Sequence, residues 1–195
     1  MANNKLLMAN NKLLILDKDG TLTTTVSGKK FVSSPVDQKV IPGMDSALIY
    51  ANKKGYTIAV ASNQGGIKAG HKTKLDTIKE FNVLHVLYPE ISVSLFCPDD
   101  GETVYKIDYE FNSSTQIARK DLPFGETQPL FRKPQAGMLE FLVSDLLPLE
   151  AKLWDNVLYI GDRHEDEAAA IDAGITFIWA DVFAKDYQRF LCRRS

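Results

Sequence analysis

Cysteine is scarce in this chain of 195 residues, which contains only Cys97 and Cys192. Two cysteines this far apart do not build a disulfide framework, and such sparing usage is typical of a reducing compartment. They also fall short of the four ligands that a structural zinc site needs. With 45% hydrophobic residues, the chain is long enough to bury a sizeable core within about one domain.

Membrane and export signals are absent as well, and so is any large excess of one charge. No run approaches the roughly 18 apolar residues of a membrane span, and the N-terminus lacks the charged, apolar and small-residue succession of a secretory signal. Lys and Arg number 23 and Asp and Glu 25, so the net charge of -2 excludes the broad basic surface of a non-specific nucleic-acid binder. We expect a cytoplasmic protein with no membrane partner, in which any phosphate recognition is local.

The same heptapeptide occurs twice at the N-terminus, over residues 1–7 and 8–14, and each copy begins with Met. The repeat is too short to be a solenoid unit, so we interpret it as a duplicated or misassigned start. No linker rich in Ser, Pro or Gly divides the rest of the chain. We expect an N-terminal extension over residues 1–11 and one domain over residues 12–195.

Short apolar runs alternate with longer segments of helical period along that domain, which predicts βαβ units and a mainly parallel sheet. The runs are almost continuously apolar, as in strands that are covered on both faces. The fold class that follows is α/β, a Rossmann-like, doubly wound sheet with helices on both faces. The expected strands are Lys12–Leu16, Tyr56–Ala61, Ser92–Cys97, Asn156–Ile160 and Ile175–Trp179, and the expected helices are Met44–Lys54, Thr73–Leu87, Gly137–Leu147, Glu165–Ala173 and Val182–Leu191. The polar segment Asp99–Pro129 predicts an excursion from the sheet.

Three of the expected strands run into a polar residue. The first is followed by Asp17, the second by Ser62, and the fourth passes through Gly161 into Asp162. In a doubly wound sheet, ligands bind outside the carboxyl ends of the strands. If the three strands are neighbours, these side chains therefore converge on one site.

The segment Asp17-Lys18-Asp19-Gly20-Thr21 is the most specific of these signals. Two carboxylates two residues apart in an extended turn can point into one pocket, and Gly20 lets the backbone bend behind them. Because like charges repel, the pair needs a cation or a proton, and phosphoryl transfer uses both: one carboxylate attacks phosphorus and the other carries a proton. The alternative is an Asx-type turn that closes a strand.

Three further segments carry suitable chemistry, each with a plainer alternative. Arg132-Lys133-Pro134 places cations before an expected helix, although taken alone it is more typical of an exposed basic loop. Asp162 and Asp166 are spaced i, i+4 at a helix N-terminus, which suits Mg²⁺ coordination but also simple capping. The segment 62–66 offers a hydroxyl, an amide and flexible backbone N–H groups to a phosphate, although a lone Gly-rich turn is a weak signal.

In this order, the four segments resemble the motifs of the haloacid dehalogenase superfamily of phosphatases, over Lys12–Ala180. The resemblance implies that Asp17 is the nucleophile, that Asp19 is the general acid and then the base, and that Lys133 steadies a phosphoaspartate. It also implies that Ser62 and Asn63 bind the substrate phosphate, and Arg163 is a further expected phosphate contact. The implied cofactor is Mg²⁺, with Asp17, the backbone carbonyl of Asp19, Asp162 and Asp166 as ligands.

The amino-acid sequences of segments 62–67 and 132–138 resemble those of one branch of this superfamily. That branch contains the histidinol-phosphate, heptose bisphosphate and polynucleotide 3'-phosphatases. The first two of these carry a zinc loop of cysteines and a histidine, where this chain has Cys97-Pro98-Asp99 and Pro129-Leu130-Phe131. One thiolate out of four ligands does not hold zinc. We therefore expect no zinc, a small phosphorylated metabolite such as a sugar phosphate as substrate, and 3'-phosphorylated nucleic-acid ends as the second choice.

The sequence leaves two more alternatives open. The gap after Asp19 is too short for a large cap domain, and the segment between Ser62 and Lys133 must already hold a helix and a strand. An open site of this kind favours either large substrates or a partner subunit that closes the pocket. A non-enzymatic phosphoacceptor of receiver type would also gather acids and a lysine at strand ends, but receivers have no second acid two residues beyond the phosphorylated one. The favoured function is thus a Mg²⁺-dependent phosphomonoesterase with a phosphoaspartyl intermediate.

Overall fold

The computed structural model describes residues 11–123, 127–148 and 156–192. The extension expected over residues 1–11 lies outside the described residues except for Asn11, which is exposed. None of the helices in the described ranges is long and apolar enough to cross a membrane.

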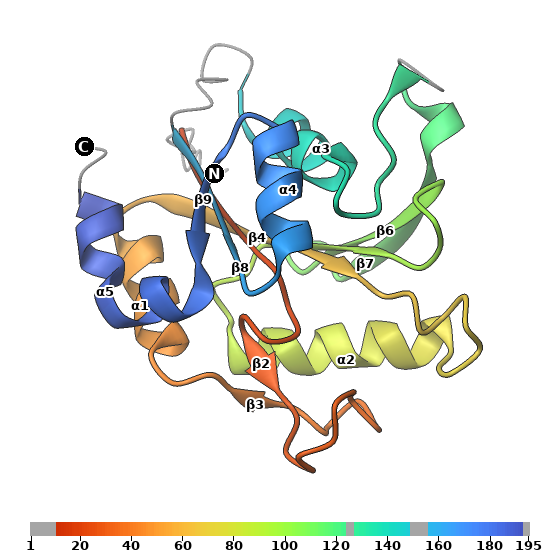
Figure 1. Cartoon of the computed structure of the whole chain (residues 1–195), viewed down its shortest axis with the longest axis horizontal. Helices are drawn as coiled ribbons and strands as arrows, with labels where there is room; N and C mark the ends of the chain where they lie inside the picture. Colours follow the sequence, from red (N-terminus) through yellow and green to blue (C-terminus); the bar gives the residue numbers. More distant parts are fainter. Residues whose placement is uncertain (1–10, 124–126, 149–155, 193–195) are drawn as a thin grey trace, which may run out of the picture.

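A seven-stranded sheet of order β7-β6-β5-β4-β1-β8-β9 forms the centre of the molecule (Figure 1). Its parallel strands are β1 (Lys12–Leu16), β4 (Tyr56–Asn63), β5 (Val93–Cys97), β8 (Val157–Gly161) and β9 (Thr176–Trp179). These strands lie where the apolar runs predict them, and β1 is placed between β4 and β8. The expected mainly parallel sheet is confirmed.

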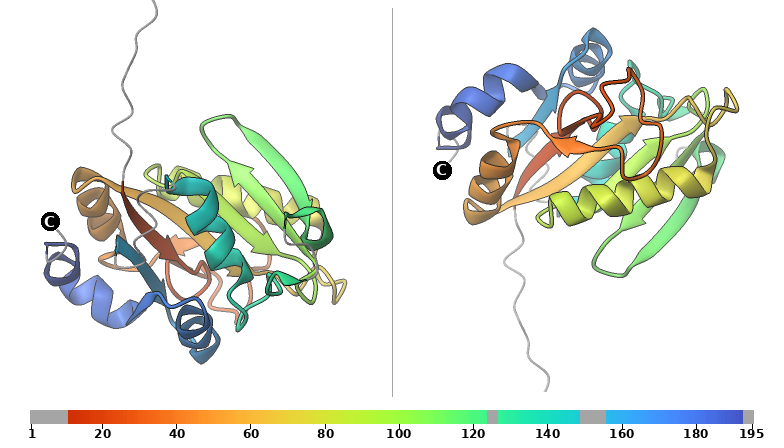
Figure 2. Two further views of the ribbon diagram at one scale, coloured as in Figure 1. Left: turned by 90° about the horizontal axis from the view of Figure 1, so that it is seen from above. Right: turned by 90° about the horizontal axis from the view of Figure 1, so that it is seen from below.

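Helices cover both faces of this sheet, as Figure 2 shows. One face carries α1 (Met44–Lys53), α2 (Lys74–Leu87) and α5 (Ala180–Cys192), and the other carries α3 (Gly137–Leu146) and α4 (His164–Asp172). Side chains of β1 alternate between the two cores: Leu14 packs into the first, whereas Leu13 and Ile15 pack into the second. All three are fully buried, which explains why the strand reads as an unbroken apolar run. The expected Rossmann-like, doubly wound arrangement is confirmed.

The segment 99–129 corrects one expectation. Instead of leaving the sheet, it extends the sheet by an antiparallel hairpin of β6 (Thr103–Asp108) and β7 (Ser113–Ala118), with a single 3₁₀ turn at Arg119–Asp121. The prediction of an excursion was wrong because β7 is an edge strand whose residues are mostly polar and exposed. Its strand conformation depends on pairing with β6. A strand of this kind has no run of apolar residues by which the sequence could reveal it.

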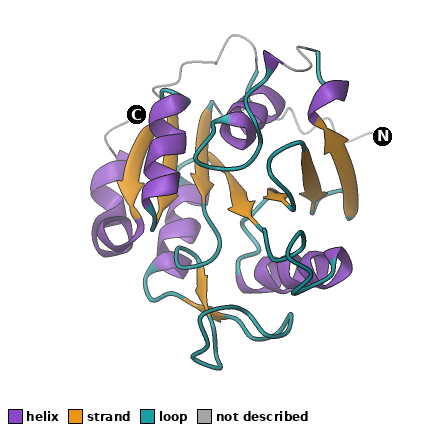
Figure 3. Ribbon diagram, turned by 45° about the vertical axis from the view of Figure 1, so that its right-hand side comes forward, coloured by secondary structure: helices purple, strands orange, loops and turns teal. Residues whose placement is uncertain are grey.

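The described residues form no large cap over the sheet. Between β1 and α1 the chain makes a small antiparallel pair, β2 (Thr23–Thr24) and β3 (Lys39–Val40), joined by the loop 25–38. Figure 3 shows this loop, in teal, projecting from the lower side of the molecule. The carboxylate of Asp37 accepts hydrogen bonds from the backbone N–H groups of Ser27 (2.7 Å) and Ser33 (3.0 Å) and from both hydroxyls (2.8 Å each). One buried acid thus holds the two halves of the loop together.

We predict that Asp37→Asn loosens this loop. The donors of Ser27 and Ser33 lose a charged acceptor, so their amides should exchange with solvent faster, as hydrogen exchange would measure. The matched control is Asp45→Asn, which removes an exposed acid from the first turn of α1. Unchanged exchange at both serines in Asp37→Asn would contradict the assignment.

The same contacts give the loop a pH dependence. The N–H and O–H donors of Ser27 and Ser33 hold the pKa of Asp37 well below its usual range. The contribution of ionised Asp37 is therefore complete above the ordinary Asp pKa of about 4 and declines as the pH falls below it. The protection of the Ser27 and Ser33 amides, measured at each pH relative to their intrinsic exchange rates, should fall only in that acidic range.

Candidate active site

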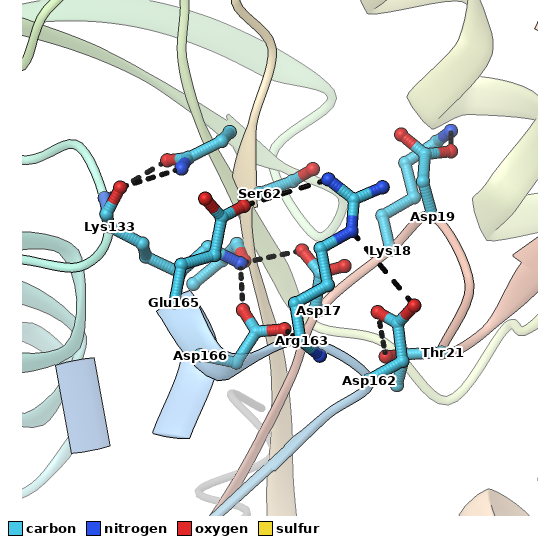
Figure 4. A network of polar contacts seen from close by, with 12 residues as sticks. Asp17, Lys18, Asp19, Thr21, Ser62, Lys133, Asp162, Arg163, Glu165 and Asp166 are labelled. Atoms are coloured by element: carbon cyan, nitrogen blue, oxygen red, sulfur yellow. Dashed lines mark hydrogen bonds and ion pairs between the residues drawn. The ribbon is translucent and has the colours of Figure 1, made fainter. Parts of the chain in front are cut away.

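The sheet order brings the predicted site residues to one edge. Asp17 follows β1, Ser62 and Asn63 are the last residues of β4, and Asp162 follows β8. Since β1 lies between β4 and β8, the three strand ends are neighbours, as expected. The loop before α3 adds Lys133, and the first turn of α4 adds Asp166 (Figure 4).

Lys133 lies at the centre of this group and is almost fully buried. Its Nζ atom is 2.6 Å from Oδ1 of Asp17 and 2.6 Å from Oδ1 of Asp166. The carbonyl oxygen of Ala61 and the hydroxyl oxygen of Tyr159 lie 2.9 Å from the same atom. Tyr159 in turn donates its O–H to Asp166 over 2.8 Å. One ammonium therefore bridges two acids that come from different elements.

The single positive charge of Lys133 does not offset the burial and mutual repulsion of the acids around it, and this changes their pKa values. Burial raises the pKa of Asp17 to about 7, because the opposing effect of Lys133 is partly offset by repulsion from Asp166 and Asp19. Burial likewise raises the pKa of Asp162, and repulsion from Asp166 adds to this. Burial by itself would lower the pKa of Lys133, but attraction to Asp17, Tyr159 and Asp166 outweighs it and raises that pKa well above its usual value.

Carboxylate oxygens of Asp17, Asp162 and Asp166 all lie within 4.8 Å of one another. Three hard oxygen donors this close, with raised pKa values at two of them, are a donor set that fits Mg²⁺. The side chain of Asp19 is not in this group. The ligand expected from that residue is its backbone carbonyl, which stays a prediction.

Two glycines allow the acids to approach this closely. Gly20 has a φ of 93°, and a Cβ atom there would lie 2.2 Å from Oδ2 of Asp162. A Cβ atom on Gly161 would lie 2.4 Å from the Cβ of Asp166. A side chain at either position would therefore push an acid out of the group.

Asp19 occupies a separate part of the site, with 36% of its side chain exposed. Lys18 donates to its Oδ1 over 2.6 Å, and Gln64 donates to its Oδ2 over 3.0 Å and to the hydroxyl of Ser62 over 2.9 Å. Burial would raise the pKa of Asp19, but the charge of Lys18 and the hydrogen bonds from Lys18 and Gln64 outweigh it and lower the pKa. The two carboxylates of the Asp-x-Asp segment thus have opposite electrostatic environments.

Asn63 and Arg163, the two other predicted phosphate contacts, differ in how far their side chains are already engaged by protein groups. The side-chain amide of Asn63 donates to the carbonyl of Lys133 over 2.9 Å and accepts from its N–H over 3.0 Å, so it fixes the backbone that carries the central lysine. Arg163 is about half exposed, and its guanidinium lies 3.6 Å from Glu165 and 4.0 Å from Asp162. Both residues line the cavity described next.

A cavity of about 570 Å³ opens beside these residues. Its wall includes Asp162, one acid of the group of three, and cations on the loop 25–38 and the segment 63–73. The charged residues in its lining are Asp19, Lys29, Lys30, Lys72, Arg132, Asp162, Arg163 and Glu165. Five of these side chains are cations and three are acids, so an anionic molecule fits this lining.

Sequence reasoning missed several residues of the site. Tyr159 contacts both Lys133 and Asp166, yet in the sequence it is one more apolar-looking residue of a buried strand. Gln64 links Asp19 to Ser62, but its segment reads only as a flexible turn. Lys18 stands between Asp17 and Asp19 in the sequence. This placement indicates a buried ion pair, and sequence reasoning did not use it.

The loop after Cys97 is held by hydrogen bonds. The carboxylate of Asp99 accepts from the N–H groups of Gly101 (2.8 Å) and Thr103 (3.3 Å) and from the Thr103 hydroxyl. Burial raises the pKa of the Cys97 thiol to about 12, and a protonated thiol is a poor metal ligand. The expected absence of zinc stays a prediction.

Comparisons with known proteins identify a matching family and similar sequences. The family model described as polynucleotide kinase 3 phosphatase matches residues 12–189. A D-glycero-beta-D-manno-heptose-1,7-bisphosphate 7-phosphatase of Pseudomonas putida is 38% identical over 166 residues, which cover 84% of this chain and 78% of that protein. The protein described by the same name from Haemophilus influenzae is 27% identical over 173 residues, covering 85% of this chain and 78% of its own length.

Solved structures show the same fold. The D,D-heptose 1,7-bisphosphate phosphatase from B. bronchiseptica, crystallised with magnesium and phosphate, superposes with a TM-score of 0.61. Its sequence identity is 22%, and the match covers 85% of this chain and 78% of that one. At this identity the likeness concerns the fold alone.

Proposed function

The chain belongs to the polynucleotide kinase 3 phosphatase family, within the haloacid dehalogenase superfamily, and is a phosphatase; we propose that it cleaves phosphomonoesters through a covalent phosphoaspartyl intermediate. One observation carries this proposal: buried Asp17 is paired with Lys133, while Asp19, two residues on, reaches the cavity. The membership favours an enzyme over a non-enzymatic phosphoacceptor. Because the family model spans residues 12–189, we also propose that residues 12–195 form one phosphatase domain.

The chemistry divides between the two carboxylates. An oxygen of Asp17 attacks phosphorus, the bond from phosphorus to the leaving oxygen breaks, and Asp19 gives that oxygen a proton. Asp19 then takes a proton from the water that attacks the phosphoaspartate, which releases phosphate and regenerates Asp17. Lys133 keeps positive charge beside Asp17 throughout, and its own position is fixed by Asn63.

The protonation of Asp19 must change between the two steps. The lowered pKa of Asp19 in the free protein keeps its carboxylate ionised, which is the form that accepts a proton in the second step. A phosphate dianion that enters the cavity beside Asp19 raises this pKa, because a nearby like charge disfavours ionisation. Asp19 can then carry the proton that the first step needs.

We propose Mg²⁺ as the cofactor, held by Asp17, Asp162, Asp166 and the backbone carbonyl of Asp19. The cluster of three carboxylate donors is what supports this assignment. When bound, the ion supplies positive charge that offsets the acids and stabilises charge on the phosphoryl oxygens. Ser62, Asn63 and Arg163 remain the proposed protein contacts of the phosphate.

We propose a small phosphorylated sugar as the substrate. The named relatives act on a heptose bisphosphate, and a cavity of about 570 Å³ is suited to a small molecule. Lys29 and Lys30 line the cavity and have no ion pair among the described residues. They are available to a second negative group on the substrate.

A second candidate is the 3'-phosphorylated end of a nucleic acid, and one observation favours it. Phe31 lines the cavity although it is 69% exposed, and Nζ of Lys30 lies 5.3 Å from the centre of its ring. An exposed ring beside a cation suits a stacked base. A screen of sugar phosphates, nucleotides, histidinol phosphate and 3'-phosphorylated oligonucleotides separates the candidates, since turnover of the oligonucleotides should depend strongly on salt.

We predict that the phosphatase activity requires the metal. Exhaustive chelation should leave almost no turnover, and added Mg²⁺ should restore it. Asp162→Asn removes one proposed ligand and should raise the Mg²⁺ concentration needed for half-maximal activity. Glu167→Gln, which removes an acid of α4 outside the group of three, is the control and should leave that concentration unchanged. Full activity in the chelated protein would refute the metal assignment.

We also predict a division of labour between the two carboxylates. Asp17→Asn removes the nucleophile and should abolish turnover of every substrate. Asp19→Asn removes proton transfer, a contribution of about 10² to 10⁴ in rate, and should slow alkyl phosphates most and aryl phosphates least. With an aryl phosphate it should accumulate phosphoenzyme, because no base activates water.

Intact-protein mass spectrometry after a rapid quench detects this species. The Asp17→Asn variant, otherwise folded as the wild type by circular dichroism, should never show it. Phosphoenzyme in Asp17→Asn would overturn the assigned roles.

A further inference from the structure

The side chain of Asp19 is one member of a closed ring of polar contacts, which lies on the side away from Lys133. Lys18 donates to one oxygen of Asp19 and also lies 3.8 Å from Oε2 of Glu80. The same Glu80 oxygen lies 2.8 Å from Nζ of Lys72, which in turn donates to the side-chain carbonyl of Gln64. Gln64 closes the ring by donating to the second oxygen of Asp19 over 3.0 Å.

The ring balances its own charges in a buried place. It contains two acids, two lysines and one neutral amide, so it has no net charge. Lys18 is 0% exposed and Glu80 is 3% exposed by side chain, whereas Lys72 and Asp19 reach the cavity. A fully buried ammonium needs compensating acids, and Glu80 and Asp19 are the two acids that pair with Lys18 in the described part of the chain.

The ring also connects Asp19 to a helix. Glu80 lies in the middle of α2, which packs on the sheet through Phe81 and Leu84. Both oxygens of Asp19 are occupied by ring members, so the plane of its carboxylate is set by residues that are themselves held by Glu80. Figure 4 shows the ammonium of Lys18 against Asp19, well away from the contacts of Lys133.

We propose that Glu80 and Lys18 are positioning residues for the proton transfer by Asp19. They hold the carboxylate at the cavity wall in the orientation from which it reaches the leaving oxygen. This inference rests on the proposed function, in which Asp19 moves that proton. If the ion pair served only the stability of the fold, its loss would reduce the turnover of all substrates equally.

The leaving group provides the test. In Glu80→Gln the side chain keeps its shape, but Lys18 and Lys72 lose their shared acid and the ring acquires a net positive charge. A misplaced Asp19 should lose part of its contribution to the rate, which is the protonation of the leaving oxygen. Because an alkyl leaving group needs this proton more than an aryl one, kcat with glycerol 2-phosphate should fall about tenfold more than kcat with 4-nitrophenyl phosphate. KM should change little for either substrate, since Glu80 does not line the cavity.

The matched control is Glu110→Gln, which removes an exposed acid from the turn between β6 and β7 and should leave both kcat values unchanged. Lys72→Met breaks the same ring from a partly exposed loop position, and it covers the case in which Glu80→Gln does not fold. It should show the same selective loss on the alkyl ester. Equal losses on both esters, or no loss on either, would overturn the inference.

These outcomes separate the inference from the proposed function. A wild-type protein that never forms a phosphoenzyme would refute the proposed function itself. A wild-type protein that forms one, combined with equal losses in the ring variants, would refute only the role of Glu80 and Lys18.

Discussion

The burial of the Lys133 ammonium between two carboxylates is the constraint on which the site depends. A buried charge is tolerated only where partners of opposite charge and hydrogen bonds are well placed. Here the partners come from the end of β1 and the start of α4, with a hydroxyl from β8. The parallel order that places β1 between β4 and β8 is what brings these groups together.

Other contacts then hold the lysine and its acids in place. Asn63 binds both backbone polar groups of Lys133 and so ties the loop before α3 to the end of β4. Asp166 uses one oxygen for Lys133 and the other for the backbone N–H of Arg163 at the start of α4. A carboxylate at a helix N-terminus is favourable by itself, so the catalytic arrangement and the helix start support each other.

The two carboxylates of the Asp-x-Asp segment differ because they meet different neighbours. Asp17 points into the crowded group of acids around Lys133, where burial and repulsion raise its pKa to about 7. Asp19 points into the ring of Lys18 and Gln64, where the charge of Lys18 and hydrogen bonds lower its pKa. Two residues with the same side chain thereby acquire different protonation equilibria within one site.

The sequence was most informative where one physical rule acts alone. Apolar runs such as Leu13–Leu16 predict buried parallel strands because both faces of the sheet are covered, and residues at their carboxyl ends, such as Asp17 and Ser62, do lie together. It was misleading for β7, whose polar residues become a strand only through pairing. Tyr159 was missed for a similar reason, since the contact that matters depends on Lys133, far away in the sequence.

A double-mutant cycle between Lys133 and Asp166 tests the account most directly. The free energy of unfolding in urea would be measured without metal for the wild type, Lys133→Met, Asp166→Asn and the double variant. Breaking a buried pair from one side costs about 3–5 kcal/mol, so we expect Lys133→Met, which leaves two buried acids without their cation, to be much less stable. Asp166→Asn should cost less, because Lys133 still pairs with Asp17. The double variant should be more stable than the sum of the two losses predicts, by more than about 1 kcal/mol. Strictly additive losses would show that the lysine does not bridge the acids, which would contradict the account.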